Sequence, residues 1–228
     1  MIHTLQVADL QFFIQMQLFI PKEDIDNLKV YCLPTIQQDL INIKENIPWF
    51  SRMMIYPEVK IECNLINNKT FEEYTTKNEV YYGTCHLVQN NFAKPQSIKT
   101  DNYIFVEDYK GDYSLPKLAD MCEAKGIKLV SLQSFKKTTK NTQIDKTKYT
   151  FCEKLGIIQN CAGYVGYDYS VFAPIAYRYL RKRKICILKS DKIDYIENIL
   201  KYHPAKDLEF LYNDVADFLE NKTLWPDA

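Results

Sequence analysis

The chain has 228 residues, of which 46% are hydrophobic and 14% aromatic, enough apolar material for a sizeable core and too much for an intrinsically disordered protein. Its 29 basic residues balance its 29 acidic residues, so the net charge gives no attraction for a polyanion, and nucleic-acid contact would need a local patch. The stretch from Leu10 to Ile20 is interrupted by glutamines and follows no basic region. We therefore expect neither a signal peptide nor a contact with the membrane.

The seven cysteines are odd in number, scattered, and mostly embedded in apolar segments. This usage favours buried thiols over a disulfide framework. It predicts an intracellular, reducing compartment, either the nucleus or the cytoplasm.

Residues 1–56 are predicted to be a helical N-terminal region. Apolar residues from Leu5 to Ile20 recur at helical spacing, and Pro21 stops the pattern. A second helix is expected to begin near Thr35, which forms a capping-box pattern with Gln38, and to end at Pro48.

Residues 57–135 are predicted to form an α/β core, most clearly at its C-terminal end. A β-branched and aromatic strand, Tyr103–Val106, is followed by an amphipathic helix that Gly126 closes as a left-handed C-cap, and Ile127–Val130 is a second strand. Because a strand–helix–strand crossover joins parallel strands, we expect these two strands to lie parallel and buried.

The other segments are less regular. Upstream of the crossover, two extended segments, Val59–Cys63 and Thr84–Val88, flank an amphipathic piece at 70–82 for which helix is favoured over strand. Residues 136–148 are almost entirely polar and are predicted to be a linker. Residues 149–228 are expected to be a helix-rich α/β part, with a strand at Ile185–Leu188 and an amphipathic helix from Leu208 to Glu220.

Common cofactor motifs are missing from the sequence. Only six glycines exist, and none forms a glycine-rich phosphate loop, so nucleotide binding in its common forms is disfavoured. The G-x-x-G at Gly163–Gly166 occurs in one family of RNA-binding domains, but its aromatic neighbours favour an ordinary turn. Histidines and cysteines lack zinc-site spacing, so no metal or other cofactor is expected.

Two charged patterns could carry chemistry. Asp108 and Lys110 form a D-x-K pattern after a strand, and with Glu58 they could hold a divalent cation and activate water, as in a metal-dependent nuclease. A solvated, charged turn explains the same residues. The one dense basic cluster could contact nucleic acid or could be a solvated helix end; it comprises Arg178, Arg181, Lys182, Arg183 and Lys184.

The run Thr100–Asp108, followed by Lys117-Leu118-Ala119 and by Ala124–Ser131, resembles the second half of a BRCT repeat. The upstream segments from Val59 to Val88 could supply the first half, so the resemblance covers about residues 59–135. It implies a protein-interaction fold in which Lys117 would contact a phosphoserine. A generic β-α-β unit explains most of the same residues, and both interpretations stay open.

Taken together, these features favour a non-enzymatic protein-interaction or scaffold module. Catalytic constellations are not recognisable, whereas tyrosines and arginines, which are enriched at binding hot spots, are available. The expected partner is another protein, within a nucleic-acid-associated complex if the basic cluster is used. The alternative is an enzyme, either the metal-dependent nuclease or another small α/β enzyme.

Overall fold

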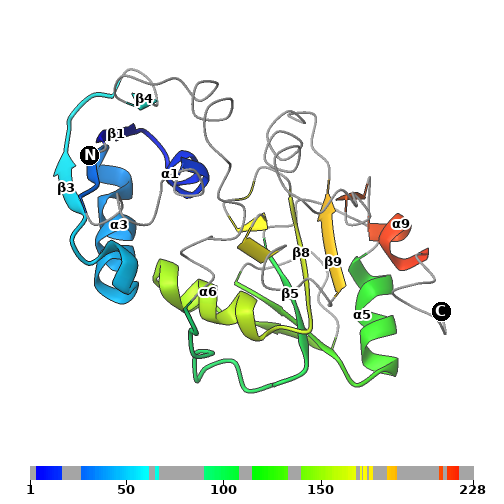
Figure 1. Ribbon diagram of the computed structural model, residues 1–228. Helices are drawn as coiled ribbons and strands as arrows, with labels where there is room; N and C mark the ends of the chain where they lie inside the picture. The colour runs from blue at the N-terminus through cyan, green and yellow to red at the C-terminus, as the bar shows by residue number, and fades with distance from the viewer. Residues whose placement is uncertain are drawn as a thin grey trace. The chain divides into compact units, whose positions relative to one another are not determined.

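The computed structural model describes residues 4–16, 27–61, 65–66, 90–107, 115–132, 140–167, 170, 172–173, 175–176, 184–188, 211–212 and 215–220. The chain divides into two compact units (Figure 1). Unit 1 comprises Met1–Asn90 with Thr150–Cys152, and unit 2 comprises Asn91–Tyr149 with Glu153–Ala228. The α/β class predicted from the sequence is confirmed, because parallel sheets and helices occur in both units.

Unit 1 contains a sheet that has, in the described residues, the strand order β3-β2-β1-β4. The strands are β1 (Thr4–Val7), β2 (Lys29–Cys32), β3 (Met54–Pro57) and β4 (Leu65–Ile66), and β4 is antiparallel to β1 while the others pair in parallel. The helical elements are α1 (Leu10–Met16), α3 (Pro34–Asn46) and the short 3₁₀ helix η1 (Pro48–Phe50).

The N-terminal region was predicted to be helical, and it also contains strands. Leu5 and Val7 are buried in β1, where they alternate with half-buried or exposed neighbours, and α1 begins only after Asp9, whose Oδ1 accepts a hydrogen bond of 2.7 Å from Phe12 N. Pairing of β1 with β2 uses Leu5, which the sequence pattern assigns to a helix face. The long-range partner strand could not be seen from local spacing.

Two further local predictions in unit 1 differ from the structure. The α3 helix lies where it was expected, but its N-cap is Leu33 with Pro34 in the first turn, and no side chain caps it, so the capping box with Thr35 does not form. The predicted strand at Val59–Cys63 is wrong for its described part, since β3 ends at Pro57 and residues 59–61 are irregular, with Val59 96% exposed. The predicted elements at 70–82 and 84–88 lie outside the described residues.

Unit 2 contains a larger, entirely parallel sheet that has, in the described residues, the strand order β7-β6-β5-β8-β9-β10. Its strands are β5 (Tyr103–Val106), β6 (Lys128–Ser131), β7 (Thr142–Ile144), β8 (Gly163–Tyr167), β9 (Lys184–Leu188) and β10 (Leu211–Tyr212). Its helices are α5 (Leu115–Ala124), α6 (Phe151–Asn160) and α9 (Val215–Glu220).

The predicted crossover is confirmed in the centre of this sheet. β5 and β6 are parallel, and Ile104 lies opposite Leu129 with both side chains 0% exposed. Gly126 has φ +65° and ends α5, while Ile127 N donates to Cys122 O at 2.8 Å and Gly126 N to Glu123 O at 3.0 Å. These are the two hydrogen bonds of a Schellman cap.

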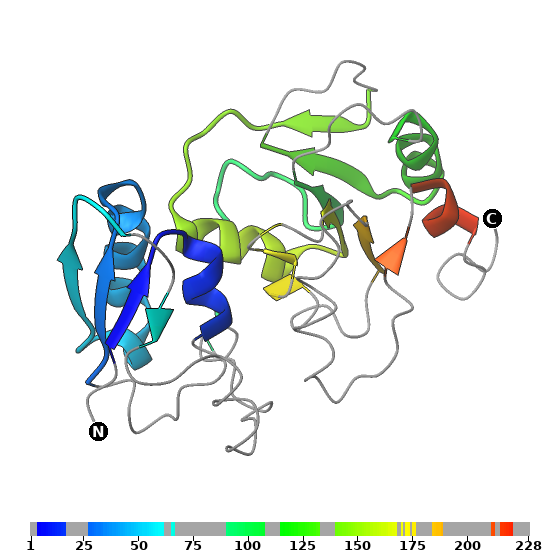
Figure 2. The same ribbon diagram turned by 90° about the horizontal axis from the view of Figure 1, so that it is seen from above.

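Helices cover both faces of the sheet (Figures 1 and 2). Ile104, Val106 and Leu129 face α5 and α9 and share one apolar cluster with them. On the opposite face lies α6, where the hydroxyl of the fully buried Tyr103 donates to Ile157 O at 2.6 Å. Unit 2 is therefore a three-layer α/β/α structure.

Several C-terminal predictions differ from the structure. The polar segment at 136–148 contains β7, an edge strand in which polar residues are tolerated because it is only half-buried. The G-x-x-G at Gly163–Gly166 lies in β8 rather than in a turn. The predicted helix at 208–220 is divided into β10 and α9, whereas the predicted strand at 185–188 is confirmed as β9.

The described cysteine side chains are buried, as the sequence predicts. They are the thiols of Cys32, Cys122, Cys152 and Cys161, and burial raises the pKa of Cys32. Among the helices that the structure describes, none has the length and apolar character of a membrane span.

Candidate functional site

The order of strands in unit 2 creates a switch point between β5 and β8. When the six strands are numbered in chain order, their spatial order across the sheet is third, second, first, fourth, fifth and sixth. The chain therefore proceeds from β5 towards one edge of the sheet and from β8 towards the other. In parallel α/β sheets with this order, ligands bind in the crevice outside the carboxyl ends of the strands at that point.

A cavity of about 560 Å³ lies at this position. Its walls include Phe105 and Glu107 from the end of β5, Leu132 just after β6, and Tyr167 at the end of β8. The volume lies within the range of roughly 300–1,000 Å³ that small-molecule sites occupy. The strand ends and the cavity therefore coincide.

Glu107 is the central acidic group of the cavity. It directly follows β5, is half-buried, and its Oε2 accepts hydrogen bonds from the hydroxyls of Tyr164 and Ser170, the latter at 2.5 Å. Ser170 Oγ in turn accepts a bond of 3.0 Å from Phe172 N. Burial and the neighbouring Glu107 carboxylate raise the pKa of Tyr164 well above its ordinary value, so this hydroxyl stays a donor.

A second carboxylate network holds Tyr149, which lines the cavity. Asp145 directly follows β7 and is buried; its Oδ1 accepts from Thr147 N at 2.9 Å and its Oδ2 from Tyr149 Oη at 2.6 Å. Burial alone would raise the pKa of Asp145, but the hydrogen bonds from Thr147, Tyr149 and Ser97 together lower it to about 2. Burial and the bond to Asp145 raise the pKa of Tyr149. Tyr149 is thus a neutral, fixed side chain in the cavity wall.

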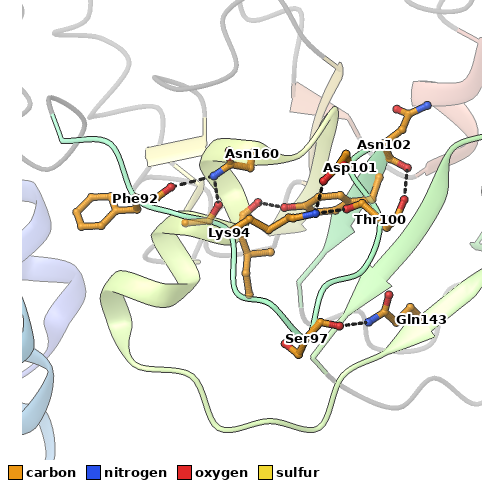
Figure 3. Close-up of polar contacts among 11 residues, drawn as sticks. Phe92, Lys94, Ser97, Thr100, Asp101, Asn102, Gln143 and Asn160 are labelled. Carbon is orange, nitrogen blue, oxygen red and sulfur yellow. Dashed lines mark hydrogen bonds and ion pairs between the residues drawn. The ribbon is translucent and has the colours of Figure 1, made fainter.

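The segment that leads into β5 is held by hydrogen bonds to side chains of β7 and α6 (Figure 3). Gln143 of β7 donates from Nε2 to Ser97 O at 3.0 Å, and the Ser97 hydroxyl contacts that of Tyr149. At the end of α6, Asn160 Nδ2 donates a hydrogen bond of 2.9 Å to Phe92 O. The segment is therefore held to both β7 and α6, and it fixes the position of Ser97 beside Tyr149.

Two lysines line the cavity from the β7–α6 side. Lys154 belongs to α6, is half-buried, and its Nζ lies 5.9 Å from the centroid of the Phe172 ring. Lys148 lies in the segment before α6 and is exposed. Within the described lining, two cations therefore accompany one carboxylate, Glu107.

The site residues predicted from sequence do not meet in this cavity. Glu58 is exposed after β3 in unit 1, and Asp108 and Lys110 lie outside the described residues. Lys117 is exposed on α5, on the sheet face opposite to α6. Within the described part of the chain, no three side chains of the metal-ligating types gather into a group.

Of the basic cluster, the structure describes only the backbone of Lys184. Lys184 is the first residue of β9 and therefore lies at the amino edge of the sheet, opposite to the edge that carries the cavity. The other four residues, Arg178, Arg181, Lys182 and Arg183, lie outside the described residues.

Sequence reasoning did not single out Glu107, Tyr149 or Lys154. Glu107 carries one usable signal, since it is the first charged residue after a buried strand, which in a parallel sheet is where ligand-binding groups gather. Tyr149 and Lys154 follow a strand that the polar composition of residues 136–148 conceals.

Comparisons of the chain with protein-family models, curated proteins and solved structures found no match.

Proposed function

We propose that unit 2 binds a small organic molecule in the cavity at the carboxyl ends of β5, β6 and β8. The observation that carries this proposal is the coincidence of the cavity with the switch point of a parallel sheet. A fold alone does not define a function, so the proposal depends on the side chains that converge there.

These side chains suit a planar ligand that donates hydrogen bonds. The Glu107 carboxylate can accept from a ligand hydroxyl or amino group, and Tyr164 and Ser170 hold it in place. Tyr149 and Phe172 offer aromatic surface on the walls of the cavity. The cavity therefore combines one fixed acceptor and two lysines with aromatic and aliphatic side chains, and a few placed polar groups among apolar ones are typical of a specific small-molecule site.

Fragment screening by protein-observed NMR tests this proposal. In the full-length chain, planar fragments that carry a hydroxyl or amino group should shift the amide signals of Glu107, Tyr149 and Ser170. Replacing Glu107→Gln keeps the shape and an acceptor for Tyr164 and Ser170 but removes the charge, so we expect affinity to fall about tenfold or more, as for the loss of a hydrogen bond to a charged group.

The matched control is Asp120→Asn, which makes the same acid-to-amide change at an exposed position of α5 and should leave fragment binding unchanged. Fragments that shift signals only elsewhere in the chain, or that bind the Glu107→Gln variant as tightly as the wild type, would contradict the proposal. Three interpretations of the sequence stay predictions alongside this proposal: the protein-interaction role, the BRCT resemblance and the nuclease alternative.

A further inference from the structure

The lysine of α6 lies in an unusual setting. Lys154 is half-buried against an aromatic ring, and it makes no ion pair with any residue that the structure describes. An ammonium group that is partly removed from water is stabilised by an aromatic face, and more strongly by an anion. The open side of Lys154 faces the cavity, where a ligand anion would complete its environment.

The other charged groups of the cavity complement different parts of a ligand. Lys148 adds a second cation from the segment before α6, whereas Glu107, at the end of β5, is the carboxylate of the described lining. A ligand that carries both an anionic group and hydrogen-bond donors would satisfy the lysines and Glu107. A purely cationic or purely apolar ligand would leave Lys154 without a counter-charge.

Aromatic surface adds the third element of recognition. Tyr149 is held by Asp145 and Ser97, so its ring is fixed before a ligand arrives. A fixed ring binds a planar heterocycle by stacking, at little cost in conformational entropy. The cavity of about 560 Å³ can hold a ring, a sugar and one phosphate group.

On the basis of the function proposed above, we infer that the ligand is a nucleoside phosphate whose phosphate group is bound by Lys154 and Lys148, with Glu107 accepting hydrogen bonds from its sugar or base. In this arrangement lysine side chains from the β7–α6 side do the work that glycine-rich loops do elsewhere through backbone N–H groups. The inference therefore fits a chain without a glycine-rich phosphate motif.

Calorimetric titration of the full-length chain with the four ribonucleoside 5′-monophosphates, and separately with the matching nucleosides, tests this inference. At least one monophosphate should bind tenfold or more tightly than its nucleoside. This difference in affinity should shrink as the salt concentration rises. Lys154→Met should raise the dissociation constant of the monophosphate about tenfold and leave that of the nucleoside within twofold. Lys154→Arg should preserve the preference for the monophosphate over the nucleoside.

Lys128→Met is the matched control, because this exposed lysine lies at the amino edge of the same sheet, at the start of β6. It should leave both dissociation constants unchanged. A nucleoside that binds as tightly as its monophosphate would overturn the phosphate assignment while leaving the small-molecule site in place. If planar fragments bind at Glu107 but neither nucleosides nor monophosphates do, the nucleotide class is wrong. If nothing binds at Glu107, the inference and the proposed function fail together.

Discussion

Gly166 and Tyr164 lie two residues apart on the same face of β8, and the Tyr164 side chain extends directly over Gly166. A Cβ atom at position 166 would lie 2.1 Å from Tyr164 Oη and 2.5 Å from Cζ, far inside van der Waals contact. Only glycine leaves space for this tyrosine to reach Glu107. The glycine that looks like part of a turn motif in the sequence is thus required by the packing of the Tyr164 side chain.

Replacing Gly166→Ala should therefore destabilise the protein by about 1–3 kcal/mol, the usual cost of overpacking a buried site. Urea denaturation measures this loss. In a Tyr164→Leu background, which lacks the clashing atoms, the same replacement should cost much less, and equal costs in both backgrounds would contradict the contact.

Gly156 makes a comparable close approach in α6. A Cβ atom there would lie 2.2 Å from the backbone oxygen of Ala93, which cannot rotate away as a side chain could. Alanine in a helix is normally more stable than glycine by about 1 kcal/mol, so the sign of the effect is diagnostic. We expect Gly156→Ala to destabilise by about 1–3 kcal/mol.

Thermal unfolding measures the effect at Gly156, and Lys117→Ala at an exposed position of α5 should change stability by less than about 0.5 kcal/mol. A stabilising Gly156→Ala replacement would show that the segment at 91–98 does not pack on α6 as described.

Asp145 should make stability depend on acid pH. Its pKa is lowered from 3.8 to about 2 in the folded protein, so its contribution is fully present above pH 4 and is lost as the pH falls through 2. The contribution is on the order of 2 kcal/mol for a shift of this size. The unfolding free energy of wild type minus that of Asp145→Asn should therefore shrink between pH 5 and pH 2.

Urea titrations at several pH values measure this difference. A difference for Asp145→Asn that stays constant, or grows towards low pH, would contradict the hydrogen-bond network around Asp145.

Gly126 tests the cap of α5. Its φ of +65° places it in the left-handed region, where nothing lies within 4 Å of an added Cβ, so the cost of a side chain there is conformational rather than steric. Gly126→Ala should destabilise by about 1 kcal/mol, and Gly126→Asn by less, because asparagine tolerates this conformation better. Equal effects of the two replacements on the urea midpoint would argue against the left-handed cap.

The crossover at residues 103–131 could be predicted because its signals are local. The apolar run at Tyr103–Val106, the helical spacing of α5 and the left-handed Gly126 each depend on neighbours within a few residues. A short strand–helix–strand unit joins its two strands in parallel, so the parallel pairing of β5 and β6 could be predicted; the register that places Ile104 opposite Leu129 comes from the structure.

Errors occurred where long-range pairing overrides local preference. Leu5 was assigned to a helix face with Phe12 and Met16, but it pairs in β1 once β2 is available as a partner, and Leu211 and Tyr212 fit an amphipathic helix until β9 pairs with them. β7 is too polar to be recognised as a strand from its own residues, and it becomes one because it completes the edge of the sheet.

By itself, the sequence determined the α/β class, the buried thiols and the central crossover, since composition and short-range periodicity carry that information. Only the tertiary structure decided the order of the strands, and with it the cavity in which Glu107, Tyr149 and Lys154 meet. These residues are up to 47 positions apart, and nothing in their local sequence links them. They converge because parallel strands deliver their carboxyl ends to one edge of the sheet, a consequence of topology rather than of any residue's own preference.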